Sequence, residues 1–311
     1  MALGTNHVAL TEADVFIPEL WSDEIIAAYK SNLVMRPLVT VMNHVGKKGD
    51  TIRIPTPTRG SATAKAAETQ VTLIANTETS NTYTIGSHFH YARLIEDIVE
   101  VQALGSMRRF YVDDAGYALA KQVDTAIHTL GGDLNKTSTA YDGAVIGGDG
   151  STAWDGSANT NTGNGTALTD AGIRRVIQTL DDNDVPGMNR YLVLPPVAKN
   201  TLLSLSRFTE QAFTGEQAGG NSIRNGLVGD VYGIPVYVST NCATVQADDS
   251  STNYRAGLMF QKDSLLFIEQ MGVRVQSQNK LEWLGDLFVA DMIYGTGVLR
   301  NTGGRAIIVP A

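Results

Sequence analysis

SMRRFYVDDAGYALAKQVDTAIHTL, residues 106–130, is the stretch of sequence that decides the fold. Its apolar side chains recur three and four residues apart, which is the spacing of the core-facing stripe of a helix. Gly131 and Gly132 follow, as glycine often follows the last turn of a helix. With a rise of ~1.5 Å per residue the helix would be about 37 Å long, more than a compact domain needs, which predicts a strut. The stripe consists of Val112, Ala115, Leu119, Val123, Ala126 and Leu130.

Upstream of the strut, the hydrophobic period changes to the alternation of a strand. Residues 51–55 restart an extended segment after a turn rich in glycine and lysine at 46–50, and apolar side chains alternate over residues 83–91. Residues 58–70 between them carry few apolar side chains. We therefore expect residues 51–92 to form a long two-stranded excursion. Because such a hairpin is marginally stable alone, contacts outside it must hold it in place.

The N-terminal part is expected to begin as an extended arm and to continue as a short helix. Pro18 and the absence of a sustained period favour an arm over residues 1–20. Ser22 is a good N-cap for a helix that Pro37 ends, and a strand is expected over residues 38–45. The apolar stripe of this helix consists of Ile25, Ile26, Tyr29 and Leu33.

The second half of the chain inserts helices among strands. Residues 131–166 are rich in glycine, asparagine and serine and are expected to be mostly loop. Thr169 caps a second helix, and Pro195 and Pro196 can start a third, shorter one. Helices placed among non-sequential strands predict an α+β architecture. The expected strands cover residues 191–194, 234–239, 256–260, 265–268, 273–275, 287–292 and 306–309.

The composition excludes several classes of protein. The formal charge of the 311 residues is -8, opposite to the basic footprint of proteins that neutralise nucleic-acid phosphates, so tight direct DNA binding is not expected. A single cysteine, Cys242, allows no intrachain disulfide and fits a reducing cytoplasm. Neither a classical secretion signal nor a long apolar run occurs, so no membrane span is expected. Charged residues make up only 18%, which predicts a neutral surface or one covered by partners.

Motifs for phosphate or nucleophile chemistry are missing from the sequence. The run Gly46-Lys47-Lys48-Gly49 lacks the spacing of a P-loop and is read as a turn. No G-x-S-x-G elbow and no H-E-x-x-H helix occurs. An enzyme built from residues distant in sequence stays open as an alternative.

Three polar groups could bind ions, but each has a simpler reading. His88 and His90 would share one face of a strand, with Glu96 or Asp97 as a third metal ligand, yet packing or hydrogen bonding explains the pair. The acidic run at 181–184 is read as a solvated helix end rather than a cation site. The pairs at 108–109 and 174–175 are arginines that salt bridges on helix faces explain better than phosphate contacts. No catalytic, cofactor-binding or metal-binding residues are therefore assigned.

The order of arm, hairpin excursion, strut helix and compact α+β part resembles the Hong Kong 97 fold of tailed-phage major capsid proteins. Four phrases are similar to segments of that family. They are FIPELW at 16–21 in the arm, GDTIRIP at 49–55 opening the extended loop, LVGDVYGIPV at 227–236 entering an axial strand, and YGTGVLR at 294–300 near the C-terminal close.

The resemblance implies a division of the chain into an arm, an extended loop and two domains. In this division the helix at about 106–130 is the spine helix of the peripheral domain. The implied parts are an N-terminal arm (1–50), an extended β-hairpin loop (51–92), a peripheral domain (93–166), an axial domain (167–262), return strands of the peripheral domain (263–294) and a C-terminal strand to the axial domain (295–311).

The resemblance also implies partners. Many copies of the chain would form hexamers and pentamers of an icosahedral shell in the virion, assembled in the host cytoplasm. The shell would contain double-stranded DNA without specific binding. A portal is implied, a decoration protein is allowed, and a separate scaffolding protein is expected because no long charged helical segment precedes the arm. Lys65 is the lysine placed for the isopeptide link that some members form.

Seven residues of the excursion are the candidate inter-subunit contacts. Apolar side chains on its flanks would dock on a neighbour, and charged side chains would fix the register. Gly116 and Ala120 on the strut predict a close approach by another backbone, since glycine costs ~1 kcal/mol inside a helix. A cellular encapsulin and a tail or baseplate protein are the alternative assemblies. The contact candidates are Ile52, Ile54, Arg59, Lys65, Glu68, Ile85 and Phe89.

Overall fold

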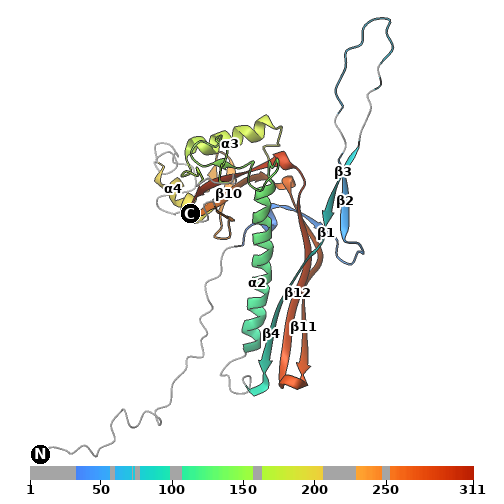
Figure 1. Ribbon diagram of the computed structural model, residues 1–311, viewed down its shortest axis with the longest axis vertical. Coiled ribbons are helices and arrows are strands. Elements are labelled where there is room, and N and C mark those ends of the chain that lie inside the picture. Colours follow the sequence, from blue (N-terminus) through green and yellow to red (C-terminus); the bar gives the residue numbers. More distant parts are fainter. Residues whose placement is uncertain are drawn as a thin grey trace, which may run out of the picture.

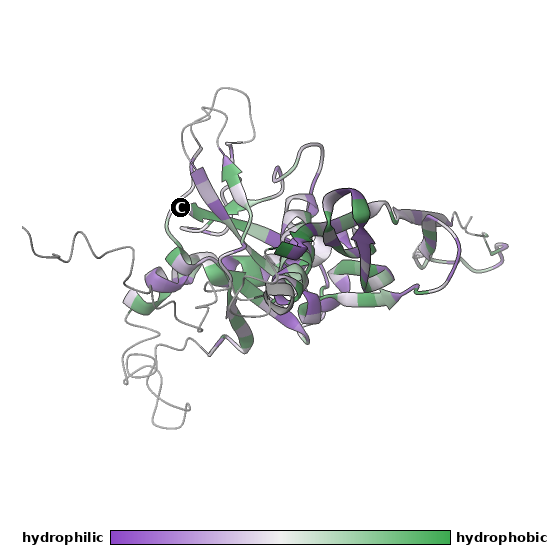
Figure 2. Ribbon diagram, turned by 90° about the horizontal axis from the view of Figure 1, so that it is seen from below, coloured by the Kyte–Doolittle hydropathy of each residue, from purple (hydrophilic) through white to green (hydrophobic). Residues whose placement is uncertain are grey.

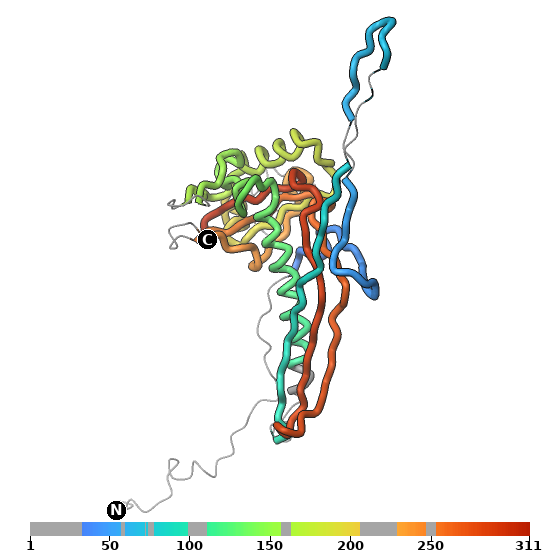
Figure 3. Tube along the Cα trace, turned by 45° about the vertical axis from the view of Figure 1, so that its right-hand side comes forward, coloured from blue at the N-terminus to red at the C-terminus, as the bar shows by residue number. Residues whose placement is uncertain are grey.

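The computed structural model describes two sheets, a separate hairpin and three helices (Figure 1). The long helix lies along one sheet, and the hairpin projects from the end of that sheet that lies nearer the second sheet (Figure 3). Among the residues described, no helix is long and apolar enough to cross a membrane. The described residues are 33–56, 60–71, 73, 78–98, 107–156, 163–205, 229–246 and 253–311.

Helix α2 (Met107–Thr129) confirms the predicted strut. It lies on a sheet of four strands in the order β1-β11-β12-β4, in which β1 pairs parallel with β11 and the other pairs are antiparallel. The strands are β1 (Thr40–Asn43), β11 (Leu265–Lys280), β12 (Gly285–Val298) and β4 (Ser87–Glu96).

The predicted apolar stripe of α2 packs on this sheet. Ala115, Leu119 and Val123 are buried in the main core, whereas Val112 is exposed and Ile127, which the stripe omitted, is buried. Each large side chain buried in this way contributes ~1.5 to 3 kcal/mol. Alternate residues of β12 face α2 in the same core, namely Phe288, Ala290, Met292 and Tyr294.

A second sheet carries the two shorter helices and confirms the α+β class. Helix α3 (Asp170–Asp182) begins as predicted, because the Thr169 hydroxyl accepts the Gly172 N–H at 3.1 Å. Helix α4 (Pro196–Ser204) follows Pro195, and Figure 2 shows the C-terminal strand β13 as largely hydrophobic. The strands, in sheet order, are β5 (Val145–Ile146), β13 (Gly304–Pro310), β10 (Asn253–Gln261), β6 (Arg190–Leu194), β8 (Ile234–Val238) and β7 (Asp230–Val231), with β9 (Thr244–Gln246) beside β10.

The prediction of one strand over residues 83–91 is wrong, because the chain changes partner at Ile85 and Gly86. Strand β3 (Thr79–Thr84) pairs with β2 (Thr51–Thr56) in the hairpin, whereas β4 pairs with β12 in the long sheet. The physical reason is a close crossing of β3 over β12. A side chain on Gly295 would lie 2.9 Å from the Thr84 carbonyl oxygen, and one on Gly297 would lie 2.4 Å from the Tyr83 ring.

Two further differences concern element boundaries. The strands expected at 265–268 and 273–275 are one continuous strand, β11, whose second half is mostly exposed and is held by its ladder with β12. Pro37 lies in a short 3-10 turn (Arg36–Leu38). The arm at 1–20 and most of the helix expected from Ser22 lie outside the described residues, and that helix does not reach Pro37 as predicted, because Leu33 and Val34 are not helical.

Candidate assembly surface

The base of the hairpin is fixed to its own chain. Tyr83 and Ile85 are buried in a small cluster with Leu266 and Ile268, against which Ile52, Ile54, Ile293 and Leu299 are partly buried. The Tyr83 hydroxyl donates to the Val298 carbonyl at 2.9 Å, and the Ile85 N–H donates to the Asp50 carbonyl at 2.7 Å. Ile85 is therefore a core residue of this subunit, which corrects its place among the contact candidates, and Ile52 and Ile54 have only part of their surface left for a neighbour.

The outer part of the hairpin is fully open. Residues 60–71 are all exposed, including Lys65 and Glu68, and the Thr69 hydroxyl donates to the Ala66 carbonyl at 2.8 Å in a local turn. Arg59 lies outside the described residues.

Two apolar residues of the hairpin were missing from the candidates. Val71 is 62% exposed and Leu73 is 91% exposed. Their signal in the sequence was the apolar run at 71–74, which follows the polar residues 58–70. Removing large apolar side chains from water lowers the free energy. Val71 and Leu73 are therefore the strongest contact candidates on the hairpin.

Phe89 does not belong to the hairpin. It lies on β4 in the long sheet, where its ring stacks on that of Tyr294 with the centroids 5.7 Å apart. The excursion thus ends before β4 begins at Ser87, earlier than residue 92.

The opposite end of the long sheet carries a second apolar surface. In the turn between β11 and β12, Leu281 is 83%, Trp283 63% and Leu284 69% exposed, and Ile98 is exposed beside them. The Asp97 N–H donates to the Leu284 carbonyl at 3.0 Å, which joins these two segments. Sequence reasoning missed this surface because it did not place a turn there. Apolar patches at both ends of an elongated subunit are typical of interaction sites.

One of the two histidines singled out in the sequence, His88, takes part in a charged network on the sheet face away from α2. His88 Nε2 lies 3.2 Å from one oxygen of Asp291, and Arg274 donates to Asp291 at 2.8 and 3.1 Å. The Arg274 bond holds the pKa of the Asp291 carboxyl below its usual range. Within the described part of the chain, no group of three or more metal-ligating side chains is found.

The acidic run at 181–184 lies at the exposed end of α3, as expected, and one of its carboxylates also forms an ion pair. Asp181 pairs at 2.6 Å with Arg190, whose side chain is buried and also donates to the Pro186 carbonyl at 2.9 Å. Arg174 pairs with Asp170 at 3.1 Å on the face of α3, as the salt-bridge reading predicted.

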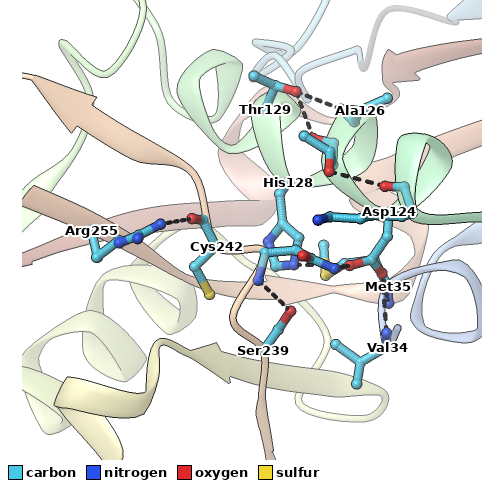
Figure 4. A network of polar contacts seen from close by, with 12 residues as sticks. Val34, Met35, Asp124, Ala126, His128, Thr129, Ser239, Cys242 and Arg255 are labelled. Carbon is cyan, nitrogen blue, oxygen red and sulfur yellow. Dashed lines mark hydrogen bonds and ion pairs between the residues drawn. The ribbon is translucent and has the colours of Figure 1, made fainter. Parts of the chain in front are cut away.

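A buried carboxylate joins three distant segments (Figure 4). Asp124 of α2 accepts the N–H groups of Val34 at 3.0 Å and Met35 at 2.9 Å, and it accepts the side-chain amide of Asn241 at 2.9 Å. His128, one turn along α2, is fully buried, and burial lowers its pKa to about 4. Cys242 is also buried, which raises the pKa of its thiol to about 12 and makes it unreactive. The site ties the segment at 33–35 and the loop at 239–242 to the strut.

Comparison with known proteins identifies the family. A model of the family described as "Phage capsid protein" matches residues 91–304, which is more than half of the chain and contains α2, both long strands and the second sheet up to the start of β13. The chain belongs to this phage capsid protein family. No curated protein matches its sequence.

Solved phage capsid structures share the fold of this capsid protein over nearly its whole length. A chain from Mycobacterium phage Che8 is 23% identical, with a TM-score of 0.75 over 94% of this chain and 97% of that one. The capsid of cyanophage P-SCSP1u is 20% identical, with a TM-score of 0.72 over 96% and 94%. The mature capsid of bacteriophage PhiM1 is 15% identical, with a TM-score of 0.70 over 99% and 97%. The predicted capsid fold is confirmed.

Proposed function

We propose that this capsid protein is the major capsid subunit of a tailed phage, which assembles with copies of itself into the hexamers and pentamers of an icosahedral shell. The observation that carries the proposal is the pair of apolar surfaces at the two ends of the elongated subunit, Val71 and Leu73 on the hairpin and Leu281, Trp283 and Leu284 at the far turn. Contacts at both ends allow one subunit to join several neighbours. The family match favours a phage shell over a cellular encapsulin.

In this proposal each part of the fold has a place in the shell. The long sheet with α2 is the peripheral domain, the second sheet with α3 and α4 is the axial domain, and the hairpin is the extended loop that lies on a neighbour. Lys65 and Glu68 would form the charged contacts of that loop, with Arg59 beyond the described residues. The partly buried faces of Ile52 and Ile54 would contribute at its base.

The charge of the chain decides how the proposed shell would hold its DNA. With a formal charge of -8, the subunit would contain packaged double-stranded DNA rather than bind it, because it has no surplus of cations to release counterions from phosphates. A scaffolding protein, a portal and, in some assemblies, a decoration protein would act during assembly in the host cytoplasm.

A catalytic role has little support. The pocket beside α2 has a volume of about 260 Å³, below the ~300 to 1,000 Å³ of typical small-molecule sites. The family is one of structural proteins, and we propose that the chain catalyses no reaction.

Removal of the hairpin tip tests the proposal. Residues 59–72 would be deleted and the ends joined by a short turn containing glycine. Since residues 60–71 of this segment are exposed and the hairpin base holds Tyr83 and Ile85 in the core, the shortened subunit should stay soluble and melt like the full chain. Negative-stain microscopy and gradient sedimentation should then show no closed shells. Shells as complete as those of the full chain would make the hairpin a mere surface loop and would contradict the proposal.

A further inference from the structure

A pocket of about 260 Å³ opens between α2 and the long sheet, on the side of β11. Leu33, which directly follows residues 22–32 in the chain, forms part of its wall. The other walls come from α2, β11 and β12. The lining consists of Leu33, Arg36, Ala120, Val123, Asp124, Phe267, Glu269, Val273 and Met292.

The pocket continues as an open apolar strip along the helix. Val273 and Val275 point to the side of the sheet that α2 covers, yet each is 52% exposed, because α2 packs mainly over β12 and β4. On the helix, Ala120 lines the pocket and Gly116 lies one turn before it on the same face. No heavy atom of the described chain lies within 4 Å of a side chain built on Gly116. The small residues that predicted a close approach thus border open space within the described part of this subunit.

The polar groups around the pocket already have partners. Arg36 pairs with Glu269 at 2.6 Å and lies 5.7 Å from the centre of the Phe267 ring. The Asp124 carboxylate accepts its bonds from Val34, Met35 and Asn241. What remains open is apolar and small, so it suits one or two side chains of a protein segment rather than a polar ligand.

The residues that precede Leu33 in the same chain carry suitable apolar side chains. Ile26 and Tyr29 are three residues apart, so they share one face of the helix expected from Ser22, and Leu33, which lines the pocket, follows Tyr29 by four residues. We propose that residues 22–32 dock on this strip of their own subunit, with Tyr29 and Ile26 packed against Val273, Val275 and Ala120.

The attachment point favours the subunit's own segment over a second copy. Val34 and Met35 are held by Asp124 at the rim of the pocket, so Tyr29 is only five residues from a fixed point. A tether this short gives an effective concentration in the millimolar range, which a segment from another subunit has to exceed. Docking would cover the valines and fix the direction in which the remaining arm leaves the subunit.

Disulfide trapping tests the proposal and identifies the occupant. The full chain would carry Cys242→Ala together with Tyr29→Cys and Val273→Cys, and a parallel chain would carry Ile26→Cys and Val275→Cys. Mild oxidation by an added oxidant should join the two thiols within one chain, seen as a faster-running monomer on a non-reducing gel and a cross-linked peptide by mass spectrometry. As a control, Tyr29→Cys with Leu94→Cys, on the opposite face of the sheet, should not react. A dimer-sized product in both test chains would assign the strip to a second copy of the chain. No cross-linked product in either test chain would show that residues 22–32 do not occupy the strip. Either result would overturn the proposal.

Proteolysis gives an independent readout on a chain without cysteine pairs. Docking should protect Lys30 from trypsin, and Val273→Asp should speed cleavage there about tenfold, the change that a loss of ~1.4 kcal/mol of docking free energy produces. Leu94→Asp places the same charge on the other face of the sheet and should leave the cleavage rate unchanged. Equal rates for Val273→Asp and the unaltered chain would contradict docking, even if shells still form. The test therefore separates this proposal from the proposed shell function.

Discussion

The carboxylate of Asp124 and the imidazole of His128 lie 3.6 Å apart, one turn from each other on α2, and both side chains are buried. Neither ring nitrogen of His128 has a hydrogen-bond partner in the described structure. Burial disfavours the charged imidazole more than the carboxylate favours it, so the pKa of His128 falls to about 4. His128 is thus neutral in the folded subunit at neutral pH, although it stands beside an acid.

Acid should therefore destabilise the subunit through His128. In the unfolded chain a histidine has a pKa of about 6.5, so it binds a proton below that pH. In the folded subunit His128 stays neutral down to about pH 4. The free energy of unfolding should fall between these two values, by roughly 1 to 3 kcal/mol. Urea unfolding at a series of pH values from 7.5 to about 4 would measure this slope.

Two variants separate His128 from the other histidines. His128→Leu should lose most of the slope in this window, whereas His90→Leu, at an exposed position, should keep it. The aspartates with lowered pKa, such as Asp142 at about 2, reduce stability only as the pH falls below about 5, so the slope of His128 is taken between about pH 6.5 and 5. An unchanged slope in His128→Leu would mean that another group senses the acid.

Loss of the Asp124 carboxylate should destabilise the subunit more than most surface changes. Asp124→Ala leaves the N–H groups of Val34 and Met35 and the amide of Asn241 without their acceptor. An unsatisfied buried donor costs ~1 to 3 kcal/mol, so we expect a loss of roughly 3 to 5 kcal/mol in the free energy of unfolding. Asp182→Ala, at the exposed end of α3, should change it by less than ~0.5 kcal/mol. A melting temperature equal to that of the unaltered chain would show that water replaces the carboxylate.

The sequence predicted those parts of the fold whose signals are local. Helix α2 followed from its apolar spacing and its two terminal glycines, and α3 followed from the Thr169 cap and its stripe. Pairing partners were not predictable in this way. The alternation of apolar side chains runs through Ile85 and Gly86 without a change, although β3 pairs with β2 nearby and β4 pairs with β12 about 200 residues later.

The candidate surface was predictable only in part for the same reason. An exposed loop can be read from its polar composition, which is why Lys65 and Glu68 were found. Whether an apolar residue is buried depends on where distant strands meet, so Ile85 was taken for a contact and Trp283 was not considered. The role of Asp124 was equally hidden, because two of its donors lie about 90 residues upstream.

The glycines under the hairpin should be intolerant of side chains. Gly297→Ala places a carbon 2.4 Å from the Tyr83 ring, which is buried and held by its bond to Val298, so the ring cannot easily move. We expect a loss of ~1 to 3 kcal/mol, as for other overpacked cores. Gly116→Ala, where the described chain leaves open space, should instead stabilise the isolated subunit by up to ~1 kcal/mol through helix propensity. Thermal unfolding of both variants would check the contrast, and a neutral Gly297→Ala would mean that the hairpin base shifts freely.

The exposed apolar residues of the hairpin should matter for assembly and not for folding. Val71→Ser combined with Leu73→Ser changes side chains that are already in water, so the melting temperature of the free subunit should stay the same. In a shell each residue would bury apolar surface worth ~1.5 to 3 kcal/mol per side chain, repeated at every subunit contact. Shells should then form only at a subunit concentration raised about tenfold or more, measured by light scattering and sedimentation. Met188→Ser, a similar change at another highly exposed apolar residue in the turn after α3, should assemble like the unaltered chain. If the double variant assembles at the ordinary concentration, the tip of the hairpin makes no apolar contact, and the charged residues Lys65 and Glu68 would have to hold it instead.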